Sequence, residues 1–190
     1  MELYDQIDAY TPCCEQEEND RRLILRCCAV FGDLFTRGNE MAHFTASAWV
    51  VTPDRSRALL AYHNQYDSWA WLGGHADGER DMLAVALREV REESGLQNVR
   101  PVSEKIYSLE ILPVAQHIKR GRFVSAHLHL NLTYLLEADE HDALRCKPDE
   151  NSGVRWFRPE EICPAVSEVP MRGIYQKLMA KLPQPEGLRP

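Results

Sequence analysis

Three glutamates in the middle of the chain have the chemistry and spacing needed to bind a cation. Glu89, Glu92 and Glu93 are three and four positions apart, so a helix would place them on one face. Arg88 can pair with Glu92 four residues later, which leaves the other two carboxylates uncompensated. Mg2+ prefers oxygen ligands and is often shared with substrate phosphates, so this face predicts a magnesium site. The simpler alternative is a solvated, salt-bridged helix face.

The segment that must position these carboxylates is GGHADGERDMLAVALREVREESGL, residues Gly73–Leu96. A glycine-rich turn leads into the helix. Leu83, Leu87 and Val90 recur at helical spacing, with Ala86 beside them, and predict the stripe that faces the core. The helix is expected to end at Ser94-Gly95, because glycine tolerates the left-handed conformation of a C-cap.

This segment resembles the signature of the Nudix hydrolase superfamily, G-x5-E-x7-R-E-U-x-E-E-x-G-U, in which U is aliphatic. Anchored on Gly74, the later signature positions are filled by Arg88, Glu89, Val90, Glu92, Glu93, Gly95 and Leu96. The first signature glutamate should fall at position 80, which is Arg80 here. Glu79 lies one residue early, and we interpret it as a shifted equivalent.

The resemblance implies a role for each matching residue. In the Nudix family a backbone carbonyl of the Gly-Gly turn helps to hold the metal, which falls here on Gly73. The family's glutamates bind Mg2+ or Mn2+, and its arginine orients a glutamate. A loop away from the signature often supplies a further acidic residue, for which Glu150 is the first candidate and Asp149 the second. The implied metal ligands are Gly73, Glu89, Glu92 and Glu93, and the implied catalytic residues are Arg88, Glu89, Glu93 and Glu150.

The resemblance also implies a fold and an activity. The fold is α+β, a Nudix-like α/β/α sandwich with a mixed sheet. The activity is metal-dependent hydrolysis of a diphosphate bond in a nucleoside diphosphate linked to another moiety. A Nudix-fold module that binds or regulates without hydrolysis is the alternative that the displaced Glu79 favours. An isopentenyl diphosphate isomerase is disfavoured, because the cysteine and glutamate motifs of that family are not found. The substrate itself stays open.

The length, composition and net charge of the whole chain limit its domain organisation and its partners. With 190 residues and ordinary hydrophobic content, the chain is expected to form one Nudix domain: a helical addition over 1–40, the core over 41–182 and a tail over 183–190. A net charge of −7 argues against nucleic acid as a partner and leaves a small nucleotide or other diphosphate as the expected one. No apolar run is long enough to span a membrane, and the N-terminus lacks the pattern of a signal peptide.

The six cysteines are expected to be reduced thiols of a cytoplasmic protein, and their spacing argues against a zinc site made from them. Residues 2–35 are predicted to be helical, with a start signal at Thr11-Pro12. Their apolar repeats could pack on the domain or form a homodimer contact.

The other elements are predicted from local patterns. Strands are expected over 43–51 and 57–63, as a hairpin, and over 68–72, where Trp69 and Trp71 would share a face. The two tryptophans are candidates for substrate contact by stacking, with packing in the core or at a sheet edge as the simpler alternative. A basic hairpin turn is predicted at 119–122, a polar loop over 139–151, a short strand over 153–157, and helices from Pro159 and Pro170.

The clearest strand pattern runs from Phe123 to Glu137. Leucines and Tyr134 alternate with polar residues, so one face is apolar and the other polar. His127 and His129 therefore point to the same side. They could line a substrate cleft or add to a metal site, whereas a solvent-exposed or internally hydrogen-bonded face is the simpler reading.

Overall fold

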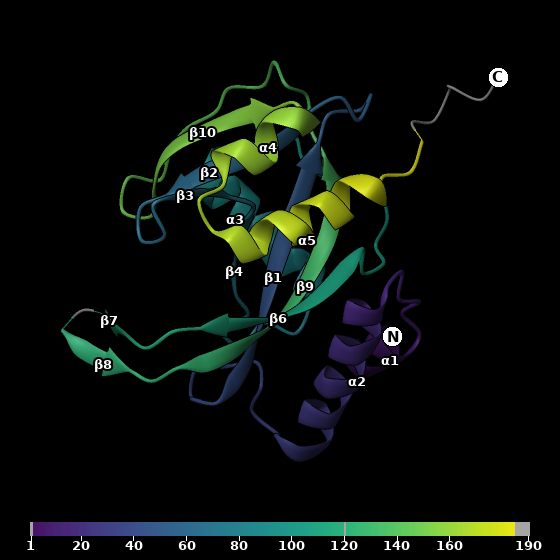
Figure 1. The fold of residues 1–190 in the computed structure, drawn as a ribbon, viewed down its shortest axis with the longest axis vertical. Helices are drawn as coiled ribbons and strands as arrows, with labels where there is room; N and C mark the ends of the chain where they lie inside the picture. Colours follow the sequence, from purple (N-terminus) through teal and green to yellow (C-terminus); the bar gives the residue numbers. More distant parts are fainter. Residues whose placement is uncertain (1, 120, 185–190) are drawn as a thin grey trace. The chain divides into compact units, whose positions relative to one another are not determined.

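The computed structural model describes residues 2–119 and 121–184 (Figure 1). The chain divides into two compact units. The first unit comprises the chain up to Ser47, Gly73–Ala86 and Glu104–Tyr134, and the second comprises Ala48–Leu72, Leu87–Ser103 and the chain from Leu135 onward. Strands β1 and β9 and helix α3 contribute residues to both units. Each unit is described by itself.

The described chain contains five helices and ten strands. The helices are α1 (Leu3–Asp8), α2 (Glu15–Val30), α3 (Met82–Ser94), α4 (Pro159–Ala165) and α5 (Val169–Ala180). The strands are β1 (Ala42–Val51), β2 (Ala58–His63), β3 (Ser68–Ala70), β4 (Leu72–His75), β5 (Arg100–Pro101), β6 (Ser108–Val114), β7 (His117–Lys119), β8 (Arg122–Val124), β9 (His127–Glu137) and β10 (Asn151–Phe157). The predicted α+β class with N-terminal helices is confirmed. Among the described residues, no helix has both the length and the apolarity to span a membrane.

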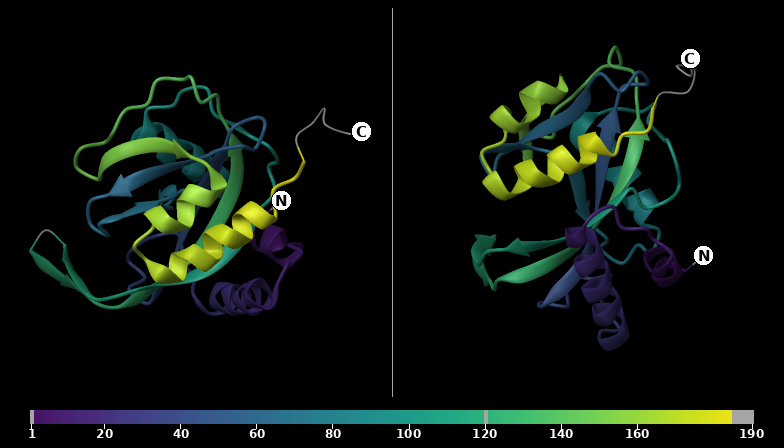
Figure 2. Two further views of the ribbon diagram at one scale, coloured as in Figure 1. Left: turned by 45° about the horizontal axis from the view of Figure 1, so that its top comes forward. Right: turned by 45° about the vertical axis from the view of Figure 1, so that its right-hand side comes forward.

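In the first unit, strands β6 and β9 form a long antiparallel pair. The pair runs from Ser108↔Thr133 to Val114↔His127. Beyond it the chain continues into the β7–β8 ribbon, in which Ile118 pairs with Phe123 (Figure 2). Strand β7 ends at Lys119 and β8 begins at Arg122, so the two ends of the predicted hairpin turn at 119–122 are confirmed. Arg120 lies outside the described residues.

The polar face of β9 is buried rather than exposed, because hydrogen bonds satisfy its side chains. The Asn131 amide oxygen accepts bonds from the hydroxyls of Thr45, at 3.0 Å, and Ser47, at 2.8 Å. Its amide nitrogen donates to Glu110 and to Thr133. Buried polar groups are normally paired in this way. The internally hydrogen-bonded reading of this strand face is thus correct for its central residues.

The N-terminal helices differ from the sequence prediction in where they begin and in which face they bury. Helix α2 begins at Glu15, not at the Thr11-Pro12 signal. Ile24 is fully buried, whereas Leu23 is 41% and Val30 75% exposed, so only part of the apolar repeat predicted for this segment faces inward. The Ile111 backbone N–H donates to the carboxylate of Asp20, which fixes α2 beside β6 (Figure 1).

In the second unit, strand β2 pairs with both β10 and β3 in antiparallel fashion. Helix α4 contacts both β10 and α5. The core forms where Trp49 stacks on Tyr175 of α5, with ring centroids 5.4 Å apart. The predicted hairpin of the first two strands is confirmed by the Val51↔Ala58 pair. The last helix begins at Val169, one residue before the predicted Pro170.

Two predicted strands are interrupted in the structure. The segment 68–72 splits into β3 and β4, and Trp71 lies between them, so the single strand on which the two tryptophans would share a face is not formed. The segment 123–137 splits into β8 and β9, with residues 125–126 outside either strand. Period-two alternation continued across both breaks, so the pattern alone did not reveal them.

An ion-pair network at the end of β9 gives a stability prediction. Glu137 lies 2.6 Å from Arg55 and 2.6 Å from Arg100, and the side chains of Glu137 and Arg55 are only 10% exposed. Burial raises the pKa of Glu137, but bonds from both arginines outweigh that effect and hold the pKa below its usual value. A depressed pKa stabilises the fold above the unfolded-state pKa, and this stabilisation is lost as the pH falls below it.

We therefore expect Glu137→Gln to lower the free energy of unfolding by about 2 kcal/mol at pH 7, because Arg55 keeps a buried charge without its carboxylate. The difference from wild type should shrink as the pH falls below about 4, where the wild-type carboxylate becomes protonated. Urea unfolding at several pH values measures this. Glu140→Gln, which removes a half-exposed pair with Arg57, is the control and should change stability by less than about 1 kcal/mol. A difference that is constant with pH would contradict the prediction.

Candidate functional site

Helix α3 begins with two carboxylates that accept backbone hydrogen bonds. The side chain of Asp81 accepts the N–H of Ala84 at 3.0 Å, as an N-cap residue does. The side chain of Glu79 accepts the N–H groups of Arg80, at 2.7 Å, and Asp81, at 2.9 Å. Gly78 has φ +96°, a conformation that suits glycine and closes the preceding turn. Glu79 therefore helps to start the helix, one residue before the position expected from the signature.

The buried face of α3 is shifted by one residue from the predicted stripe. Met82, Val85, Ala86 and Val90 are buried, whereas Leu83 and Leu87 are partly exposed. The same buried face continues to Glu93, which is only 5% exposed. A carboxylate at the buried edge of a helix needs a positive or hydrogen-bonding partner to stay charged.

Arg88 is the cation on the helix face itself. Its guanidinium lies 2.8 Å from a carboxylate oxygen of Glu89 and 3.8 Å from one of Glu92. The Glu89 side chain is only 12% exposed, and burial raises its pKa above the usual value although Arg88 opposes the change. The arrangement fits the orienting role that was predicted for Arg88.

A loop lysine brings two of the predicted acidic residues together. The Lys147 ammonium lies 3.1 Å from Glu92 and 3.0 Å from Glu150. Burial lowers the pKa of Lys147, but the two carboxylates outweigh that effect and raise it above the usual value. Sequence reasoning selected Glu150 and missed Lys147, although a lysine three residues before a glutamate is a detectable signal. Asp149, the second candidate, is exposed and has no part in this ion pair.

The end of α3 is tied to the same loop through backbone groups. The Asn151 side chain donates to the Glu93 carbonyl at 2.9 Å, and the Arg145 N–H donates to the Ser94 carbonyl at 2.7 Å. Gly95 has φ +77°, so the predicted glycine C-cap is confirmed. These bonds hold the loop at the C-terminal end of α3, where Lys147 pairs with Glu92.

Gly73 lies in the first unit, where it approaches the backbone of β1. A Cβ atom at this position would lie 2.5 Å from the Ala46 carbonyl oxygen and 2.8 Å from the Ser47 Cα atom. Only glycine permits this approach. The structure thus gives a packing reason for the residue, and its role as a metal ligand stays a prediction.

Both tryptophans pack against neighbours of the second unit. Trp69 lies edge-on to Tyr62, with centroids 5.4 Å apart, and to Phe157, at 4.8 Å. Trp71 lies edge-on to Tyr175 at 5.5 Å. These contacts are the core and edge packing that was the simpler reading, and substrate contact by either ring stays a prediction.

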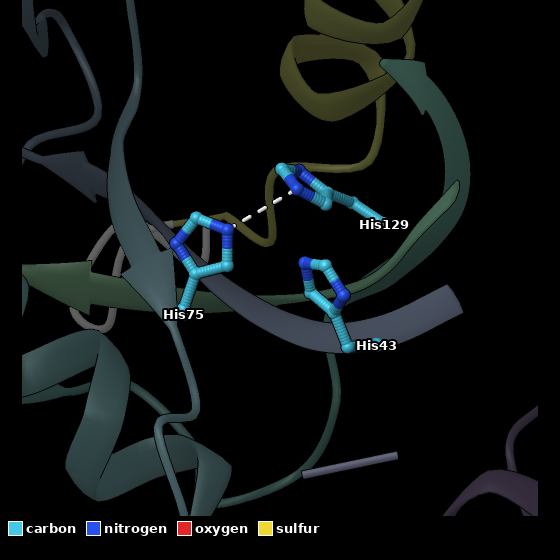
Figure 3. Close-up of side chains that lie close together, drawn as sticks. All are labelled: His43, His75 and His129. Carbon is cyan, nitrogen blue, oxygen red and sulfur yellow. Dashed lines mark hydrogen bonds between the residues drawn. The ribbon is translucent and has the colours of Figure 1, made fainter. Parts of the chain in front are cut away.

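The two histidines of β9 do lie together, and two further histidines join them. His127 and His129 have ring centroids 5.1 Å apart, and His43 lies 5.0 Å and 5.1 Å from them. The Nε2 atoms of His75 and His129 are 3.2 Å apart (Figure 3). Sequence reasoning missed His43 and His75, because their proximity depends on strands far apart in the chain.

Burial makes three of these imidazoles, those of His43, His75 and His129, poor bases. It lowers the pKa of His75 to about 3 and that of His129 to about 2, and the neighbouring cations and histidines add to the effect. Burial also lowers the pKa of His43. The rings are therefore neutral at pH 7, each with one nitrogen able to accept a bond. His127 also lines an open depression of about 500 Å3 beside Met41, Pro113 and Val114, and His129 is not among its lining residues, so substrate contact by either histidine stays a prediction.

Comparison with known proteins adds evidence on the fold. The family model described as the NUDIX domain matches residues 41–181. A search of curated proteins returns no match. One similar solved structure is the MutT protein from Methanosarcina mazei Go1, with 13% identity, a TM-score of 0.58, and coverage of 75% of this chain and 96% of that chain.

Two further solved structures have the same fold. The dihydroneopterin triphosphate pyrophosphohydrolase of E. coli has 13% identity and a TM-score of 0.55, covering 73% of this chain and 96% of its own. An Ap4A hydrolase binary complex from C. elegans has 18% identity and a TM-score of 0.54, covering 72% of this chain and 95% of its own. At these identities the likeness concerns the fold alone.

Proposed function

The chain belongs to the NUDIX family, and from this premise we propose that it is a metal-dependent hydrolase of a diphosphate bond in a nucleoside diphosphate linked to another moiety. The observation that carries the proposal is the charged face of α3 in the second unit. There Glu89, Glu92 and Glu93 lie within one and a half turns of helix, and the loop that ends at Asn151 adds Glu150 to the same ion-pair network.

The donor set fits a hard divalent cation. Glu89, Glu92 and Glu150 offer carboxylate oxygens, and Arg88 and Lys147 are the positive groups now paired with them. Oxygen ligands of this kind suit Mg2+ or Mn2+. We propose Glu89, Glu92 and Glu93, which all belong to the second unit, as the ligands. When bound, the ion would neutralise negative charge on the diphosphate and activate water for attack.

The chain's own residues would position that chemistry. Arg88 holds the Glu89 carboxylate through a bond to one oxygen, so the second oxygen can face a ligand. Lys147 holds Glu92 and Glu150 near one another by bonds to both, so it positions a proposed ligand and a proposed base together. Glu89, Glu93 and Glu150 are the proposed groups for accepting the proton of the attacking water.

The proposal is tested by hydrolysis across a nucleotide panel. We expect Mg2+-dependent release of products from at least one of ADP-ribose, dinucleoside polyphosphates, nucleoside triphosphates and sugar nucleotides. Product identity by mass spectrometry, in water enriched in oxygen-18, shows which phosphorus is attacked. Addition of a chelator should abolish release, and Mg2+ should restore it.

A nucleotide-binding or regulatory module without hydrolysis is the second candidate. It is favoured by Glu79, whose carboxylate is engaged with two backbone N–H groups at the start of α3. Tight binding of a panel nucleotide without any product would establish this candidate and overturn hydrolysis. Product formation would exclude it.

A further inference from the structure

A second cluster of donor groups, in the first unit, has a different chemistry from the carboxylates of α3. His43 of β1, His75 of β4 and His129 of β9 direct their rings toward one another (Figure 3). We propose that these three histidines bind one transition-metal ion of the zinc class, with water or a ligand in the remaining position. This proposal goes beyond the hydrolytic function and does not depend on it.

The spacing of the nitrogens carries the first part of the argument. The His75 and His129 Nε2 atoms are 3.2 Å apart. Two nitrogens bound to tetrahedral zinc at about 2.0–2.1 Å must be separated by about 3.3 Å. One ligand nitrogen from each of the three histidines lies within 4.8 Å of the other two. The third ring therefore needs to move by only about an ångström or two to complete the set.

The orientation of His43 carries the second part. Its Nδ1 lies 3.0 Å from the Asn39 carbonyl oxygen, so this nitrogen is the one that bears the proton and donates. Its Nε2 atom is then an acceptor, and it is buried with no hydrogen-bond partner among the described residues. Histidine ligands of metals are commonly fixed in this way, by a bond from the second ring nitrogen to a backbone carbonyl.

The Asn39 turn that orients His43 is itself rigid. The Asn39 side chain accepts the backbone N–H groups of Met41 and Ala42, each at 3.1 Å, and donates to Asp33 at 2.9 Å. His43 is only 4% exposed. A buried acceptor without a hydrogen bond destabilises the folded protein. A metal ion bound to the His43 Nε2 atom would remove this destabilisation.

A simple hydrogen bond between His75 and His129 is the competing explanation for this cluster. One proton shared by the two Nε2 atoms would account for their separation. It would leave the His43 Nε2 atom unexplained, although that nitrogen belongs to the same group of converging atoms. Three neutral imidazoles suit Zn2+, Co2+, Ni2+ or Cu2+ and are poor ligands for Mg2+.

The charges around the cluster permit a cation. Arg37 and Lys119 act on these histidines and disfavour added positive charge. Arg37 is paired with Asp77 through two of its guanidinium nitrogens, Nε at 2.7 Å and Nη2 at 2.5 Å, and the negative charge of Asp77 opposes its effect on the histidines. Lys119 is exposed on the β7–β8 ribbon and is screened by solvent.

The test is zinc binding by the untagged chain of 190 residues. Cys13, Cys14 and Glu17 form another group with donor atoms within 4.8 Å, so every protein in the series carries Cys13→Ser and Cys14→Ser. After removal of metal by a chelator, calorimetry in a large excess of Mg2+, which would occupy the carboxylates of α3, should show one Zn2+ bound per chain. Co2+ should give visible bands of a four- or five-coordinate site without a thiolate charge-transfer band.

Removing one ligand should weaken zinc binding selectively. His129→Gln should lower Zn2+ affinity about 100-fold or more, whereas the exposed His141→Gln should leave it unchanged. Far-UV circular dichroism and a thermal melt without metal show whether each variant folds, and His75→Asn replaces His129→Gln if that variant does not. No bound zinc, or equal affinity in the His129 or His75 variant and the His141 control, would overturn the proposal. Because no substrate is present, failure here would leave the hydrolytic proposal untouched, and failure of the hydrolysis panel would leave this one untouched.

Discussion

Replacing Glu92 with glutamine is expected to lower Mg2+-dependent turnover by about 100-fold or more while the protein unfolds at nearly the same temperature. A neutral amide removes one negative charge from the proposed ligand set, and stabilisation of charge in the transition state depends on a correctly held cation. The fold should tolerate the change, because the Glu92 side chain is 45% exposed and its pair with Lys147 is a surface interaction. Steady-state kinetics over a range of Mg2+ concentrations, with calorimetric melting, measures both effects.

A matched control separates loss of the ligand from loss of an ion pair. Glu140→Gln also removes a surface pair, with Arg57 at 2.9 Å and with a carboxylate that is 37% exposed, and it should keep full turnover. Glu93→Gln should behave as Glu92→Gln does in activity, and extra Mg2+ should restore part of the rate in either variant. Turnover unchanged in both glutamine variants would eliminate these glutamates as metal ligands.

Gly73→Ala is expected to destabilise the protein strongly, because among the glycines described here an added Cβ meets its shortest contact at Gly73. The new Cβ would lie 2.5 Å from the Ala46 carbonyl oxygen, a distance at which backbone atoms must move apart. Inserting volume into a packed site commonly costs 1–3 kcal/mol, and here the opposing atom belongs to the backbone, so we expect about 3 kcal/mol. Urea unfolding followed by circular dichroism measures the loss.

The comparison variant is Gly173→Ala in α5. A Cβ at Gly173 meets nothing within 4 Å, and alanine is favoured over glycine inside a helix, so this variant should gain about 0.5–1 kcal/mol. Opposite signs for the same chemical change would identify the contact of Gly73 with β1 as the cause. Equal stability of Gly73→Ala and wild type would show that β4 is not held as closely against β1 as in the structure.

The charged helix face could be predicted because its evidence is local. Glu89, Glu92 and Glu93 are close in sequence, and helical geometry alone puts them on one side. The same is true of the C-cap at Gly95, which the positive φ confirms. The buried stripe was shifted by one residue, since apolar residues fill two neighbouring rows of α3 and periodicity cannot choose between them. Contacts with the rest of the fold bury Val85 and leave Leu83 partly exposed.

The parts that sequence reasoning missed depend on long-range contacts. His43, His75 and His129 lie on three different strands, 32 and 54 positions apart in the sequence, and no short motif connects them. Lys147 meets Glu92 only because the loop before β10 is bonded to the end of α3. Trp71 fell outside a strand although it continued the alternation, because the chain leaves β2 there.

The two carboxylates at the start of α3 have an electrostatic consequence for ligand binding. The N-terminal end of a helix ordinarily attracts anions through its free N–H groups and partial positive charge. In this helix the amides of Arg80, Asp81 and Ala84 already bond to Glu79 and Asp81, and both acceptors are acidic side chains. A phosphorylated ligand would be repelled from this pole of the helix, so its attraction to the protein must come from cationic side chains or from an ion.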